Sequence, residues 1–93
     1  MRFLAEFYLP RDGEDLHELA GRARAAADRA SQDGAAARFL YAVHARSDES
    51  CFAVYDAESA QAVVAAGERA GIAFDRVVEA TTAGPDAESC FPG

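Results

Sequence analysis

The chain has 93 residues, which is enough for one domain with a modest hydrophobic core and too few for two. Its formal net charge of −7 at pH 7 disfavours a nucleic-acid partner, because phosphate backbones are bound by concentrated basic surfaces. The apolar opening stretch is interrupted by Glu6 and leads to no signal-peptide cleavage site, and no run reaches the roughly 20 apolar residues of a membrane span. We therefore expect a soluble, cytoplasmic protein that binds neither nucleic acid nor membranes.

The first half of the chain predicts a strand and then a helix. Residues 2–9 alternate with a period of two and carry one wholly apolar face, formed by Phe3, Ala5, Phe7 and Leu9. Pro10 ends this strand, and Asp12 is the predicted N-cap of the helix that follows. The apolar stripe of the helix has the three-and-four spacing of a helix packed on a flat surface: Leu16, Leu19, Ala20, Ala23, Ala27 and Ala30. Gly34 is the predicted stop.

The second half predicts a hairpin, a helix and a last strand. Residues 38–46 and 51–55 have strand patterns, and the polar segment "SDES" between them predicts a tight connection. Ser59 is the predicted cap of a second helix, which ends at Gly71. The inward stripe of this helix consists of Ala60, Val63, Val64, Gly67 and Ala70. Residues 75–80 form the fourth predicted strand.

The order strand, helix, strand, strand, helix, strand predicts an α+β fold, the ferredoxin-like βαββαβ sandwich. Both crossovers must be right-handed, so both helices cover one face of a four-stranded antiparallel sheet and leave the other face open. We assign this domain to residues 1–82. Residues 83–93 are rich in small residues, Gly and Pro, and are predicted to be a flexible C-terminal tail unless the sheet or a partner binds Phe91.

Gly67 stands inside the second predicted helix, where glycine costs roughly 1 kcal/mol relative to alanine. It lies on the stripe that faces the sheet, so our interpretation is that the missing side chain lets this helix approach the strands closely. The two cysteines, Cys51 and Cys90, lack the spacing of a zinc site and are expected to be free thiols in a reducing compartment.

Strand alternation divides the remaining side chains between the two faces of the sheet. The side chains predicted to point toward the helices are Phe3, Phe7, Phe39, Val43, Phe52, Val54 and Val78. Those predicted for the open face are Leu4, Glu6, Tyr8, Leu40, Ala42, His44, Cys51, Ala53, Tyr55, Val77 and Glu79. The second set is too apolar to face water, so we expect a second copy to cover it in a homodimer or higher homo-oligomer, with a cavity between the copies.

The candidate site lies on this predicted open face. The first strand runs between the third and fourth in this fold, so Glu6 and Glu79 are expected to be neighbours, with Tyr8 and Tyr55 nearby. Adjacent carboxylates repel each other and favour binding of a proton or a cation. Glu6, Tyr8, Tyr55 and Glu79 are therefore the predicted ligand-binding residues. With His44, the two glutamates would form an N/O ligand set for a divalent metal such as nickel or zinc.

Two alternatives to a binding site remain open. In the first, the acidic residues are only solvated or paired across strands with Arg2 and Arg76, and the protein is an oligomerisation or stress-associated scaffold without a ligand. By analogy of fold, the chain is instead a cofactor-free monooxygenase or isomerase of the dimeric α+β-barrel type, with His44 or one of the glutamates Glu6 and Glu79 as general base.

The segment "CFAVYDAESAQAVVAAGERAGIAFDRVVEA", residues 51–80, resembles a bacterial family of small ferredoxin-like proteins of unknown function that includes nickel-binding members. The residues that match the family pattern are Tyr55, Asp56, Ala57, Ala62, Val63, Arg69, Ala70, Gly71, Asp75, Arg76, Val77 and Glu79. The likeness extends over most of residues 1–80 and implies the same fold and nickel as a ligand. Metal-binding members commonly carry two histidines, at positions where this chain has Tyr41 and Ala66.

Overall fold

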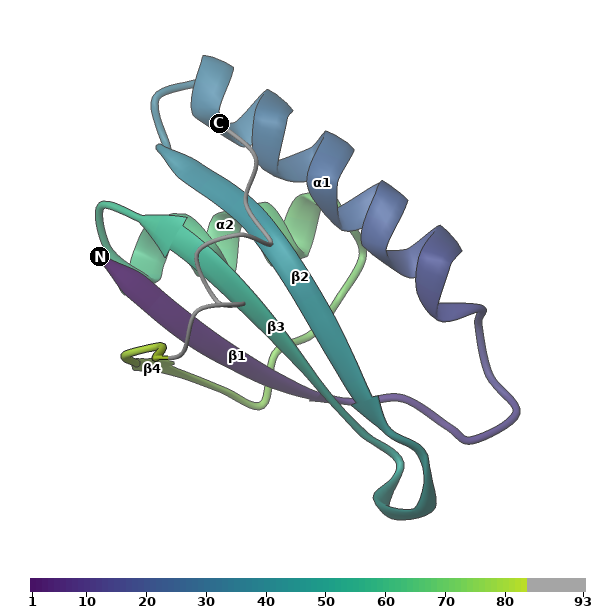
Figure 1. The fold of residues 1–93 in the computed structure, drawn as a ribbon. Coiled ribbons are helices and arrows are strands. Elements are labelled where there is room, and N and C mark those ends of the chain that lie inside the picture. The colour runs from purple at the N-terminus through teal and green to yellow at the C-terminus, as the bar shows by residue number, and fades with distance from the viewer. Residues whose placement is uncertain (84–93) are drawn as a thin grey trace.

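The computed structural model describes residues 1–83. Its elements are β1 (Arg2–Tyr8), α1 (Leu16–Gln32), β2 (Ala37–Ala45), the short 3-10 helix η1 (Arg46–Asp48), β3 (Ser50–Ala57), α2 (Ala60–Arg69) and β4 (Arg76–Glu79). The strands form one four-stranded antiparallel sheet in the order β2-β3-β1-β4, with both helices on one side (Figure 1). The predicted ferredoxin-like α+β fold is confirmed. Of the predicted tail, all but Ala83 lies outside the described residues, as do Cys90 and Phe91.

The helix caps agree with the sequence at three of the predicted positions and differ at one. Gly34, with φ 100°, follows the last turn of α1, and Gly71, with φ 75°, follows α2. The Ser59 hydroxyl accepts a hydrogen bond from the Ala62 amide at 3.1 Å and caps α2. The cap of α1 is Asp15, not Asp12, because the Asp15 carboxylate accepts the Glu18 amide at 3.1 Å.

Replacing Asp15 with alanine is expected to lower the free energy of unfolding by about 1 kcal/mol, the usual loss when an N-cap acceptor is removed. Urea denaturation of the purified protein measures the change. Asp12→Ala is the matched control, because Asp12 is exposed in the loop before α1 and does not cap the helix. Equal losses in the two variants would contradict the assignment of the cap.

The core between the helices and the sheet is lined largely by alanine. In α1 the buried side chains include Ala23, Ala26, Ala27 and Ala30, and the sheet contributes Ala5 and Ala53 opposite them. Small side chains on both surfaces allow close packing, which burial of apolar area then stabilises. The larger buried side chains are Phe3, Phe7, Leu9, Leu19, Tyr55, Val63 and Ile72.

Gly67 receives the ring of Phe74, which lies in the connection between α2 and β4. A Cβ atom at position 67 would lie 2.7 Å from Cζ and 2.9 Å from Cδ2 of that ring, and closer still to Cε2. Phe74 in turn contacts the rings of Phe7 and Tyr55, with centroids 5.7 and 6.0 Å apart. The glycine is thus a packing device, as interpreted from the sequence, but the group that it admits is an aromatic ring rather than a strand.

The predicted orientation of β1 is confirmed, because Phe3 and Phe7 are buried on the helix side. In β2 the prediction holds for Phe39, whose ring packs against Tyr55, and then fails. A β-bulge interrupts the register between Phe39 and Tyr41, which shifts the alternation by one residue. As a result Val43 lies on the open face, while Ala42 and His44 lie on the helix side, opposite Ala53 and Cys51.

The predicted orientations of β3 and β4 were wrong throughout. The side chains of Phe52, Val54 and Val78 lie on the open face rather than on the helix side. Cys51, Ala53, Tyr55, Val77 and Glu79 lie on the helix side rather than on the open face. The prediction placed the larger side chains under the helices, whereas the closely packed alanine-lined helices accept mainly small side chains from β3.

Candidate functional site

The uncovered surface of the sheet, which we call the open face, consists of cross-strand rows of side chains. Two central rows contain Val78, Leu4, Val54 and Tyr41, and then Arg76, Glu6, Phe52 and Val43. The flanking rows contain Arg2, Asp56 and Arg38 at one end and Tyr8, Ser50 and Ala45 at the other. The middle of the face is therefore apolar, apart from Glu6 and Arg76, and one end is charged.

Exposure on this face is uneven: Val54 at its centre is only 6% exposed, whereas two residues nearer its margins are accessible. Val43 is 52% exposed and Tyr8 is 64% exposed, although both belong to residue types that are usually buried or partly buried. Neither helix reaches this side of the sheet (Figure 1). A contiguous apolar surface of this kind is typical of an interaction site.

Glu6 is the acidic residue of the central rows. It is half-buried, with Arg76 opposite it on β4 and Phe52 opposite it on β3. Among the described residues, no ion pair or hydrogen bond joins its carboxylate to another group. The predicted pairing of Glu6 with Arg76 across the strands is not formed, and the carboxylate is available to a ligand.

Tyr55 was predicted to share the open face with Glu6, but it lies beneath the helices and is fully buried. Desolvation raises the pKa of its phenol to about 12, so the hydroxyl stays protonated at any physiological pH. Among the buried side-chain polar atoms of residues 1–83, the Tyr55 hydroxyl is the one without a hydrogen-bond partner. Tyr55 pairs with Phe3 and lies on the helix side of the sheet, so it does not share a site with Glu6 and Tyr8.

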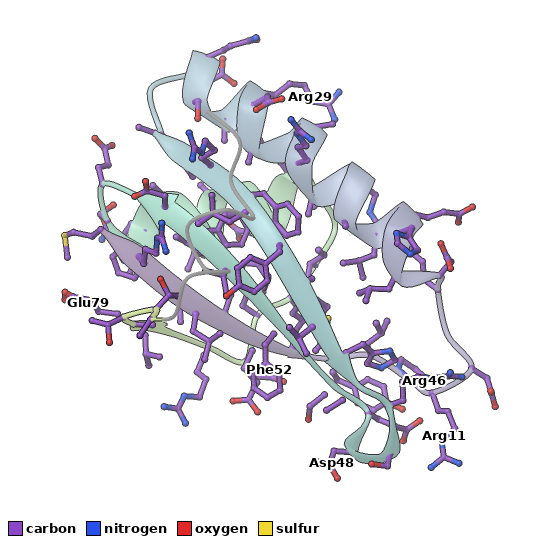
Figure 2. All side chains as sticks on the ribbon, viewed as in Figure 1. Arg11, Arg29, Arg46, Asp48, Phe52 and Glu79 are labelled. Atoms are coloured by element: carbon purple, nitrogen blue, oxygen red, sulfur yellow. The ribbon has the colours of Figure 1, made fainter. Side chains whose placement is uncertain are left out.

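The three predicted metal ligands are not brought together. The Nε2 atom of His44 lies 3.0 Å from the carbonyl oxygen of Leu9 and donates a hydrogen bond to it. Glu79 is exposed on the edge strand β4. Figure 2 shows it at the opposite end of the sheet from Arg46, and His44 precedes Arg46 by only two residues, so Glu79 is far from His44. Glu6 lies on the other face of the sheet. Within residues 1–83, no group of three or more His, Cys, Asp or Glu side chains is placed to hold a metal ion.

The sequence-based set missed the open-face residues Tyr41, Val43, Phe52 and Arg76. A signal for part of this was present, since the two predicted helices carry mostly alanine toward the sheet and β3 alternates small residues with Phe52 and Val54. Close packing against an alanine-lined layer favours small residues, and this predicts that the small residues of β3 face the helices. The bulge in β2 has no comparable signal.

No helix within residues 1–83 combines the length and the hydropathy needed to cross a bilayer. No protein-family model matches the chain, and neither does any curated protein. The crystal structure of SCO4226 from Streptomyces coelicolor A3(2) is similar, with a TM-score of 0.70 over 90% of this chain and 100% of that chain. The two sequences are 21% identical, so the similarity shows a shared fold.

Proposed function

We propose that the chain is a small binding protein that acts as a homodimer, with two open faces packed together and a small ligand held between them. The observation that supports this most directly is the apolar centre of the open face, which the chain's own helices leave uncovered. Stacked sheets lie about 10 Å apart with interdigitated side chains, which leaves a cavity where side chains are short or polar. The charged row of Arg2, Asp56 and Arg38 would lie at the rim, where protein interfaces are polar.

Glu6 and Tyr8 would provide the polar contacts to the ligand. In the proposed dimer the Glu6 carboxylate leaves water, and an unpaired carboxylate in an apolar site is costly. A ligand with a cationic or hydrogen-bond-donating group would offset that cost, while Leu4 and Phe52 would contact its apolar part. We therefore propose a small, mainly apolar ligand with one donor group.

The family resemblance supports nickel as a second possible ligand. Of the predicted set His44, Glu6 and Glu79, only Glu6 lies on the open face, so the metal form of this proposal uses Glu6 from both copies rather than His44. The unpaired Glu6 is also the group that supports the enzymatic alternative, a cofactor-free oxygenase or isomerase with Glu6 as general base. The proposal includes a cytoplasmic location, where the buried Cys51 thiol stays reduced.

Benzylamine and benzyl alcohol are matched probes of this site, because they share a ring and differ in charge. We expect both to shift the amide resonances of the open face in a nuclear magnetic resonance titration. Benzylamine should bind about tenfold more tightly, since a hydrogen bond to a charged group contributes about 1.5 kcal/mol. Glu6→Gln should remove that preference, whereas Glu79→Gln should retain it. Shifts confined to the helices, or a preference that survives Glu6→Gln, would contradict the proposal.

The nickel form is tested separately by calorimetric titration of metal-free protein. We expect Glu6→Gln to abolish any nickel binding and His44→Ala to leave it unchanged. Binding that depends on His44 and not on Glu6 would place the metal elsewhere. An absence of heat at micromolar nickel would remove the metal form and leave the small-ligand form to the titration above.

A further inference from the structure

The Tyr55 hydroxyl is an unusual feature of the core, because buried polar groups are nearly always hydrogen-bonded. Tyr55 is 0% exposed and its hydroxyl has no partner within residues 1–83. A phenylalanine would fill nearly the same volume without leaving a donor unsatisfied. Within residues 1–83, the Tyr55 hydroxyl is therefore a buried donor that no protein acceptor satisfies.

Phe74 is a partly buried side chain that packs against Tyr55. Its ring lies 6.0 Å from the Tyr55 ring, in an edge-on arrangement, and it is only partly buried. It comes from the segment after Gly71, which has no regular secondary structure before β4 begins at Arg76. The backbone on either side is held, because the Ile72 amide donates to the Gly67 carbonyl at 2.9 Å and the Asp75 amide donates to the Glu6 carbonyl at 2.7 Å. The Phe74 ring itself is positioned by side-chain packing and by the space at Gly67.

Phe74 also lines a surface groove of about 530 Å³. The groove is lined by Val64, Glu68, Gly71, Ile72, Ala73 and Phe74. Phe74 thus belongs both to this groove and to the aromatic cluster around Tyr55. A rotation of its side chain toward solvent would extend the groove into the core.

We propose that Phe74 closes a second ligand site, in which the Tyr55 hydroxyl donates a hydrogen bond to a small aromatic molecule that takes the place of the Phe74 ring. The neighbouring rings of Phe7 and Phe39 favour an aromatic ligand, since both already pack against this cluster. The carboxylate of Glu68, which lines the groove, disfavours anions. The ligand class is a neutral aromatic molecule with one oxygen, such as a phenol. This site lies on the helix side and does not depend on the open face.

Phenol and toluene are the probes, because they have the same shape and differ in one hydroxyl. In a nuclear magnetic resonance titration of the intact chain, we expect phenol to bind about fivefold more tightly than toluene, with shifts at Tyr55 and Phe74. In Tyr55→Phe the order should reverse, because the phenol hydroxyl would then be buried without a partner. Phe74→Ala should tighten binding of both probes about tenfold, since the closing side chain no longer has to move.

Ser47→Ala is the control, because it removes an exposed hydroxyl from η1, outside both proposed sites, and should leave the phenol preference unchanged. Should Phe74→Ala fail to fold, the comparison of Tyr55→Phe with Ser47→Ala still decides the matter. An equal ratio of phenol to toluene affinity in the wild type and Tyr55→Phe overturns the proposal. So does the absence of shifts at Tyr55 and Phe74, which would mean that a buried water alone satisfies the hydroxyl.

Discussion

Val43→Asp is expected to convert the proposed dimer into a monomer that remains folded. Val43 is 52% exposed on the open face of the single chain, so an aspartate there stays hydrated in the monomer. In the dimer the same carboxylate would be buried twice, once in each copy, against apolar side chains such as Phe52. Burying an unpaired charge costs several kcal/mol, so the dissociation constant should rise by at least about a hundredfold. Size-exclusion chromatography with light scattering, over a range of concentrations, measures the change.

Val64→Asp is the matched control for this experiment. Val64 is 41% exposed, but it lies on α2, on the opposite side of the molecule from the open face. We expect this variant to keep the dissociation constant of the wild type. If Val64→Asp weakens the dimer and Val43→Asp does not, the copies associate through their helices and the open face is not the interface.

Gly67→Ala is expected to lower the free energy of unfolding by about 2 kcal/mol, although alanine is the better helix former by about 1 kcal/mol. The new methyl group would overlap the Phe74 ring. That ring cannot withdraw inward, because Phe7 and Tyr55 already lie next to it. The variant must therefore displace Phe74 toward solvent and lose part of its packing. Urea denaturation followed by circular dichroism measures the loss.

Gly21→Ala provides the opposite expectation in the same protein. Gly21 is exposed within α1, and a Cβ atom there would have no neighbour within 4 Å. This variant should raise the free energy of unfolding by about 0.5 to 1 kcal/mol, from helix propensity alone. If both variants are stabilising, the Phe74 ring moves aside without losing packing energy, and the proposed packing role of Gly67 is wrong.

The fold was predictable because each element carries a local signal. The period of two in β1, the stop glycines Gly34 and Gly71 and the cap at Ser59 all depend on neighbouring residues only. The order of the elements then leaves few topologies, since crossover connections are right-handed. The orientation of β1 was also predictable, because one of its faces is entirely apolar and the other contains Glu6.

The candidate site was only partly predictable, because it depends on which way each strand faces. Glu6 and Tyr8 lie on the open face as predicted, since β1 has a clear pattern. His44 was misplaced by a single extra residue in β2, and a shift of one residue exchanges the two faces of a strand. Tyr55 and Glu79 were misplaced because the orientation of β3 and β4 depends on the fit to the alanine-lined helices. The pattern of β3 indicates that fit only when it is compared with the helix sequences, and the short strand β4 has no such pattern.

Intermolecular nuclear Overhauser effects in a mixture of isotope-labelled and unlabelled chains test most directly whether the open face is buried between two copies. The methyl groups of Leu4, Val43 and Val78 should show contacts from one copy to the other. Contacts that arise instead from the helix residue Val64, or a sample that stays monomeric at millimolar concentration with no such effects, would contradict the proposed dimer.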